Sequence, residues 1–431
     1  MRVTVIDLGE LRDDPLPPPP SRPAPRAVGR PLRLAVVLAL TLLASTAAAP
    51  VAERVAAVVP APLGTVALLA DGEVFLLEPS GTAAAPGWLS AWTVPTSAGA
   101  RPVRRWQVPV PVVSGSAQLR RHAGLLLLTG SSGRPDGAYR TFAHDRDTGR
   151  VRWQRTGSGQ PAGPDLIFED GADGPPTVHS VDPGTGRDRW SAAMPSRVTL
   201  YRHRADGVDR IVTVRPDGPA EVWDARRGVR LHTAPLDRAG PPSGTSYQVA
   251  GDLLLAAEPN GDRLTGYDVD GLTLRWDVPW RMPSFFIACG SLICAQGEAG
   301  GVRALDPATG RTVWRDNRWE LSGVERGGRL LASSLGRGVW HPLAVLDVAS
   351  GRIAAELDVW NVAASQSPHG PVFALRPAGE GRMLVAELDV AAARARVRDV
   401  LPAVSGDCQA DAQLLLCRLV DGAFGVWRVP R

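Results

Sequence analysis

Regularly spaced carboxylates are the feature of this 431-residue chain that could most directly do chemistry. Seven aspartates follow one another at intervals of 37, 42, 44, 38, 41 and 42 residues: Asp145, Asp182, Asp224, Asp268, Asp306, Asp347 and Asp389. Such groups could act as acids and bases or as ligands of a cation such as calcium. The spacing therefore predicts either a repeated acidic site or a repeated structural device.

The residues beside each aspartate favour the structural interpretation. The best copies read Asp-x-x-Thr-Gly-Arg with a tryptophan eight residues after the aspartate, and the tryptophans of this series are Trp153, Trp190, Trp276 and Trp314. The aspartate can accept hydrogen bonds from amides two or three residues on, and glycine closes the turn in a left-handed conformation. Weaker copies keep the turn and lose the tryptophan, for example at Ala355. We therefore expect turn caps and blade-packing tryptophans, with no catalytic residue among them.

The stretches between these turns are short apolar runs, which predict strands rather than helices. In one copy the runs are Leu292–Gln296, Val302–Leu305 and Arg311–Trp314, and Phe285–Ala288 lies upstream. Four short strands with their turns come to about 40 residues, which is one four-stranded blade of a propeller. The predicted fold class is therefore an all-β β-propeller.

The repeated text resembles the quinoprotein-type, or PQQ-like, propeller repeat over residues 64–431. WD40 and kelch repeats fit less well. The seven aspartates mark seven blades, and a closing blade built from both chain ends would make eight. Seven blades is the alternative. Residues 79–102 are rich in Ala, Gly and Pro and are interpreted as an insertion.

The N-terminal residues suggest export. Residues 1–33 are a Pro-rich tail with arginines and are expected to be disordered in the cytoplasm; residues 34–52 are apolar, and 53–63 are a linker. The apolar run predicts a signal-anchor transmembrane helix that leaves the propeller outside the cell membrane. The alternative is a cleaved signal peptide and secretion, because the run is short and ends in three alanines.

The four cysteines agree with an oxidising compartment. Cys289 and Cys294 flank a short turn, and Cys408 and Cys417 flank another. An even number of cysteines in local pairs predicts two hairpin disulfides. Four free thiols are the alternative, whereas a zinc site is disfavoured because no histidine lies near either pair.

Other chemistry finds little support in the residues. A net charge of +4 disfavours a nucleic-acid surface. A quinone-dependent dehydrogenase of the resembled family would need a calcium site of Glu, Asn and Asp and commonly adjacent cysteines, which this chain lacks. We therefore expect no cofactor and no metal site.

The remaining interpretation is a non-catalytic scaffold that binds a protein partner or an extended ligand on a propeller face. Its membrane contact would be the N-terminal helix. The alternative is a sensor that couples an outer ligand to a cytoplasmic partner through the Pro-rich tail, and a PQQ-dependent dehydrogenase is the less favoured third.

Overall fold

The computed structural model describes most of the chain after residue 54. The described residues are 55–79, 86–95, 100–111, 117–131, 139–170, 176–194, 196, 198–215, 219–236, 244–258, 263–280, 284–297, 300–334, 340–365, 367 and 369–429. The predicted tail, membrane helix and signal-peptide cleavage site fall at residues 1–52 and therefore lie outside the described residues. Within the described part, no helix is long and apolar enough to span a membrane.

Four antiparallel sheets each contain four consecutive strands, which we call a blade. Blade β2–β5 has β2 (Val66–Ala70), β3 (Glu73–Glu78), β4 (Gly87–Thr93) and β5 (Val103–Val110). Blade β6–β9 has β6 (Gln118–His122), β7 (Leu125–Ser131), β8 (Tyr139–Asp145) and β9 (Val151–Thr156). Blade β18–β21 has β18 (Ser246–Ala250), β19 (Leu253–Ala257), β20 (Arg263–Asp268) and β21 (Leu274–Pro279). Blade β22–β25 has β22 (Ser284–Cys289), β23 (Leu292–Gly297), β24 (Val302–Leu305) and β25 (Thr312–Asp316).

A larger sheet joins two blades through a single pairing of Ala162 with Gly207. Blade β10–β13 has β10 (Gln160–Ala162), β11 (Asp165–Asp170), β12 (Thr177–Val181) and β13 (Asp188–Ala193). Blade β14–β17 has β14 (Val198–Arg204), β15 (Gly207–Val214), β16 (Pro219–Asp224) and β17 (Val229–Pro235).

A second larger sheet shares one long strand between two blades. Its first blade has β26 (Trp319–Arg326), β27 (Arg329–Ser334), β28 (His341–Asp347) and β29 (Ile353–Val362). The end of β29 then pairs with β31 (Val372–Gly379), which continues into β32 (Arg382–Asp389) and β33 (Arg394–Pro402).

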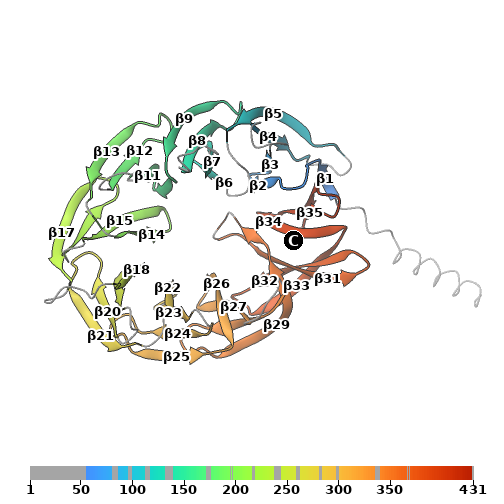
Figure 1. Ribbon diagram of the computed structural model, residues 1–431. Helices are drawn as coiled ribbons and strands as arrows, with labels where there is room; N and C mark the ends of the chain where they lie inside the picture. Colours follow the sequence, from blue (N-terminus) through green and yellow to red (C-terminus); the bar gives the residue numbers. More distant parts are fainter. Residues whose placement is uncertain are drawn as a thin grey trace, which may run out of the picture. The chain divides into compact units, whose positions relative to one another are not determined.

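The closing sheet brings the two ends of the described chain together. It has the order β1 (Val55–Val59), β36 (Phe424–Arg428), β35 (Leu414–Leu419), β34 (Val404–Asp411) and β30 (Ala364–Ser365). Figure 1 shows the blades following one another in chain order around a central region, with β1 beside the last strands. This arrangement is a β-propeller, and the all-β prediction is confirmed.

The core lies between neighbouring blades. Side chains on both faces of the middle strands are buried, as at Phe75 and Leu76 in β3 and at Leu126 and Leu127 in β7. Because each blade packs against two neighbours, both faces of such a strand are apolar, and the sequence shows runs of leucine instead of alternation.

Strands β1 and β4 correct two expectations. Strand β1 lies inside residues 53–63, which were expected to be a linker. Strand β4 likewise lies inside the supposed insertion at 79–102. The strands of residues 66–110 form their own blade, separate from the closing sheet. The eight-bladed count merged the two, so neither that count nor the seven-bladed alternative is confirmed.

Candidate functional site

The seven aspartates lie where the third strand of a blade ends and turns into the fourth. The Asp145 carboxylate accepts hydrogen bonds from the Thr148 amide at 2.9 Å and the Thr148 hydroxyl at 2.9 Å. Asp182 does the same with Thr185, and Asp347 with Ser350. The carboxylates of Asp224, Asp268, Asp306 and Asp389 each accept a backbone amide three residues on. Each side chain thus serves its own turn.

Arginines hold the second oxygen of several of these carboxylates. Arg152 pairs with Asp145, and Arg189 donates to Asp182 at 2.6 Å. The hydrogen bonds from Arg152 and Thr148 lower the pKa of Asp145 from 3.8 to about 2. In Asp182, the Thr185 hydroxyl is the main cause that lowers the carboxyl pKa. The charges of Asp145 and Asp182 are therefore neutralised locally, and no three His, Cys, Asp or Glu side chains of the described chain are grouped to hold a metal ion.

The tryptophans of the repeat lie against the glycine of the next blade's turn. The Trp314 indole N–H donates to the Val348 carbonyl at 2.7 Å, and a Cβ on Gly351 would lie 2.5 Å from the indole ring. The same contact joins Trp153 to Gly186, Trp190 to Gly228 and Trp276 to Gly310. Trp106 contacts Gly149 in the same way and was missed as a member of the series.

The glycine is absent where the preceding tryptophan is absent. His232 and Ala355 stand where two blades lack the tryptophan. In the turns that follow, Leu272 and Ala393 occupy the glycine position with φ of 51° and 52°. Both residues still close the turn through their amides. The glycine is thus needed to admit the indole ring as well as to allow positive φ.

The predicted disulfides are confirmed. Cys289 is bonded to Cys294 across the β22–β23 hairpin, and Cys408 to Cys417 between β34 and β35. The second bond lies in the closing sheet.

A cavity of about 510 Å³ lies between blades β10–β13 and β14–β17. Its lining residues are Ser158, Gln160, Glu169, Pro176, Ser196, Thr199 and Tyr201. Pro176 precedes β12, whereas Asp182 follows its other end, so the five-residue strand separates the cavity from the aspartate turns by roughly 17 Å. The cavity therefore opens on the edge of the propeller opposite those turns.

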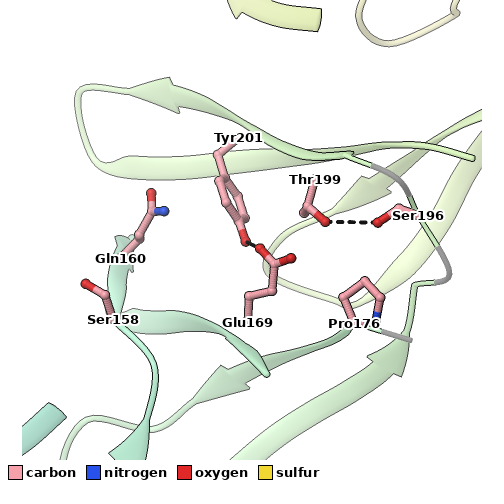
Figure 2. A pocket seen from close by; sticks show the side chains of 7 residues that line it. All are labelled: Ser158, Gln160, Glu169, Pro176, Ser196, Thr199 and Tyr201. Carbon is pink, nitrogen blue, oxygen red and sulfur yellow. Dashed lines mark hydrogen bonds between the residues drawn. The ribbon is translucent and has the colours of Figure 1, made fainter. Parts of the chain in front are cut away.

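Two hydrogen-bonded pairs shape the cavity. The Tyr201 hydroxyl donates to Glu169 at 2.9 Å, and the Ser196 and Thr199 hydroxyls are 3.1 Å apart. Figure 2 shows Ser158 and Gln160 on one side and Ser196 with Thr199 on the other. Burial raises the pKa of the Tyr201 phenol and the Glu169 carboxylate raises it further, so the phenol stays protonated.

Alternation along β14 explains how one strand serves this cavity and also the next blade. Thr199 and Tyr201 are two residues apart and share a face, whereas Arg202 points to the other side and is only 3% exposed. Arg202 donates to Asp209 at 2.9 Å, to Asp252 at 3.0 Å and to Asp270 at 3.1 Å. Since Asp252 and Asp270 belong to turns of blade β18–β21, Arg202 joins the two blades across one of the junctions that lack a tryptophan.

None of the sequence-predicted residues lines this cavity. Its residues lie in blade-to-blade connections and on strands β10, β11 and β14, and the sequence around them does not repeat from copy to copy. Repetition, the signal that located the turns, therefore could not locate the cavity.

No family model matches this chain, and no curated protein is similar to it in sequence. Solved structures with a similar chain path include the computationally designed Ika8 protein, at 14% identity and a TM-score of 0.45, covering 73% of this chain and 96% of that one. BamB from Moraxella catarrhalis is 13% identical with a TM-score of 0.40, covering 72% and 96%.

Proposed function

We propose that this chain is a non-catalytic propeller scaffold that binds a protein partner or an extended ligand outside the cytoplasmic membrane. Residues 34–52 would anchor it, with the N-terminus in the cytoplasm. The carrying observation is the cavity of about 510 Å³ at the junction of two blades. Its size falls within the roughly 300–1,000 Å³ of small-ligand pockets.

The cavity offers preformed recognition groups. Glu169 and Tyr201 are already hydrogen-bonded to each other, as are Ser196 and Thr199, so their positions do not have to be ordered on binding. The two disulfides support a location in an oxidising compartment, because cytosolic thiols are kept reduced.

Photo-crosslinking in intact cells tests this function. A photoreactive residue replaces Ser158 at the cavity or, as a matched control, the exposed Ala349 in an aspartate turn at the opposite edge. We expect a covalent adduct from position 158 and none from position 349. Adducts from position 349 alone, or from neither position, would contradict the proposal.

A further inference from the structure

We infer that the cavity between blades β10–β13 and β14–β17 binds a neutral, polyhydroxylated ligand, which is to say a carbohydrate. This inference rests on the proposed function, because it assumes that the cavity is a binding site. It adds the chemical class of the ligand.

The cavity contains polar side chains that are not already hydrogen-bonded to the protein. Within the described chain, the Ser158 hydroxyl and the Gln160 side-chain amide make no hydrogen bond, and Glu169 uses one carboxylate oxygen for Tyr201. Together these groups provide free donors and free acceptors in one cavity. A sugar hydroxyl both donates and accepts, so it needs both kinds of partner at once.

The charged groups at the cavity favour an uncharged ligand. Among the described lining residues, Glu169 is the one carboxylate and none is an arginine, lysine or histidine. Nearby Arg155 is engaged by Asp188 at 2.7 Å and lies over the Phe168 ring. A phosphate or carboxylate ligand would meet the Glu169 carboxylate, which disfavours anions.

The side chains that line the cavity are mostly polar. Pockets for drug-like ligands are lined mainly by apolar and aromatic groups. Here six of the seven lining side chains carry a polar group, and Pro176 with the Tyr201 ring provides the apolar surface. A ligand that matches has polar groups around its edge and C–H groups on its faces, which is the surface of a pyranose ring.

The side chains that line the cavity are held in place by the fold. Thr199 and Tyr201 stand on the inner strand β14, and its partner β15 pairs with it along its whole length. The Tyr201 hydrogen bond fixes the Glu169 side chain. Binding therefore immobilises few side chains, which matters for a ligand whose hydrogen bonds merely replace those to water.

A cationic side chain from a protein partner could also pair with Glu169, and the two ligand classes differ in their dependence on salt. A neutral sugar loses no ionic attraction as salt rises, whereas a cation does. We therefore compare glucose, N-acetylglucosamine, maltose and trehalose with arginine amide. The full-length chain is held in a detergent without a sugar headgroup, and binding is measured by saturation-transfer NMR.

We expect at least one of the four sugars to bind, with an affinity that is unchanged between low and high salt. Thr199→Val and Gln160→Ala should each weaken it by roughly three- to tenfold, the effect of losing one hydrogen bond. The matched control is Thr312→Val on β25, an exposed site on another blade, which should leave the affinity unchanged.

Salt-sensitive binding of arginine amide without binding of any sugar would overturn the carbohydrate inference and leave the proposed binding function intact. Equal losses from Thr199→Val and Thr312→Val would also overturn it, because the sugar would then bind elsewhere. Failure of the crosslinking experiment together with absence of binding by all five probes would remove both proposals.

Discussion

At the scale of single residues, the indole of Trp314 and the bare Cα of Gly351 are complementary parts of one contact. The indole ring occupies the space that a Cβ would fill, and its N–H bonds the turn that carries the glycine. The effect on stability of changing either residue therefore depends on whether the other is present.

We predict that Gly351→Ala destabilises the protein by about 2–4 kcal/mol, since it adds a clash with Trp314 to the strain of φ +68°. In a Trp314→Ala background the clash disappears, and the further cost of Gly351→Ala should fall to about 1 kcal/mol. Urea unfolding of the four chains of this cycle measures both costs. Strict additivity would contradict the contact, and Ala393→Gly, where no indole is present, should change stability by less than about 1 kcal/mol.

The depressed pKa of Asp145 predicts a pH-dependent contribution. The folded pKa of about 2 lies below the ordinary 3.8, so the ionised carboxylate stabilises the turn above about pH 4. That contribution is lost as the pH falls through the folded pKa. Asp145→Asn should lower the melting temperature by a constant amount from pH 7 to 5, and the difference should shrink between about pH 4 and pH 2.

Asp147→Asn is the matched control, because the Asp147 side chain is 74% exposed and its pair with Arg105 is superficial. A difference for Asp145→Asn that stays constant down to pH 2 would show that the charge itself contributes nothing.

At the scale of elements, the turns could be predicted from the sequence because Asp306, Thr309 and Gly310 are close together in the chain. The contact between a tryptophan and the next blade's glycine could not be seen in one copy, since the partners are about 37 residues apart. It could have been found by comparing copies, because Leu272 and Ala393 stand in the turns that follow His232 and Ala355, where the tryptophan is absent. The cavity had no such signal, since Ser158 and Ser196 lie in connections of unrelated sequence.

At the junction between blades β14–β17 and β18–β21, an arginine bonded to carboxylates joins the blades, whereas several other junctions contain an indole ring. Burial is the largest single effect on the pKa of Asp209 and of Asp270 and acts to raise both, but the hydrogen bonds from Arg202 together with the charges of Arg202 and Arg210 outweigh it and lower both. The arginine therefore stabilises both carboxylates in their ionised form.

Arg202→Ala should destabilise the protein by about 1.5–3 kcal/mol, the value of hydrogen bonds to charged groups that are partly buried. Arg226→Ala is a matched change, because Arg226 and its partner Asp206 are each 57% exposed, and it should cost less than about 1 kcal/mol. Urea unfolding at neutral pH compares the two. Equal costs would mean that Arg202 does not join the blades.

At the scale of the whole molecule, one side-chain amide forms two of the hydrogen bonds that join the closing sheet to blade β2–β5. Gln409 of β34 accepts from the Leu69 amide at 3.1 Å and donates to the Ala67 carbonyl at 2.7 Å. Its side chain thus makes one accepted and one donated hydrogen bond to the β2 backbone, as a neighbouring strand would. Among the described residues, Gln296 makes only the accepting half of this arrangement, from the Leu321 amide.

Gln409→Glu removes the donor and sets a carboxylate against the Ala67 carbonyl, so it should destabilise the junction by about 1–3 kcal/mol. Hydrogen exchange should speed up in β2 and β34 and stay unchanged in β18–β21. Gln296→Glu keeps its one hydrogen bond and serves as the control. Uniform acceleration across all blades would contradict a local role for Gln409.

The pairing of β1 with β36 also sets an order of events during synthesis. Val55 cannot pair with Trp427 until that residue, about 370 residues later in the chain, has been synthesised. At roughly 5–20 residues per second, the hydrogen-bonding edge of β1 stays without its partner for about 20–75 s. An open strand edge invites pairing with other chains, and a short strand limits that hazard. The five-residue length of β1 thus reduces the danger of a ring that can be completed only after its last strand has been made.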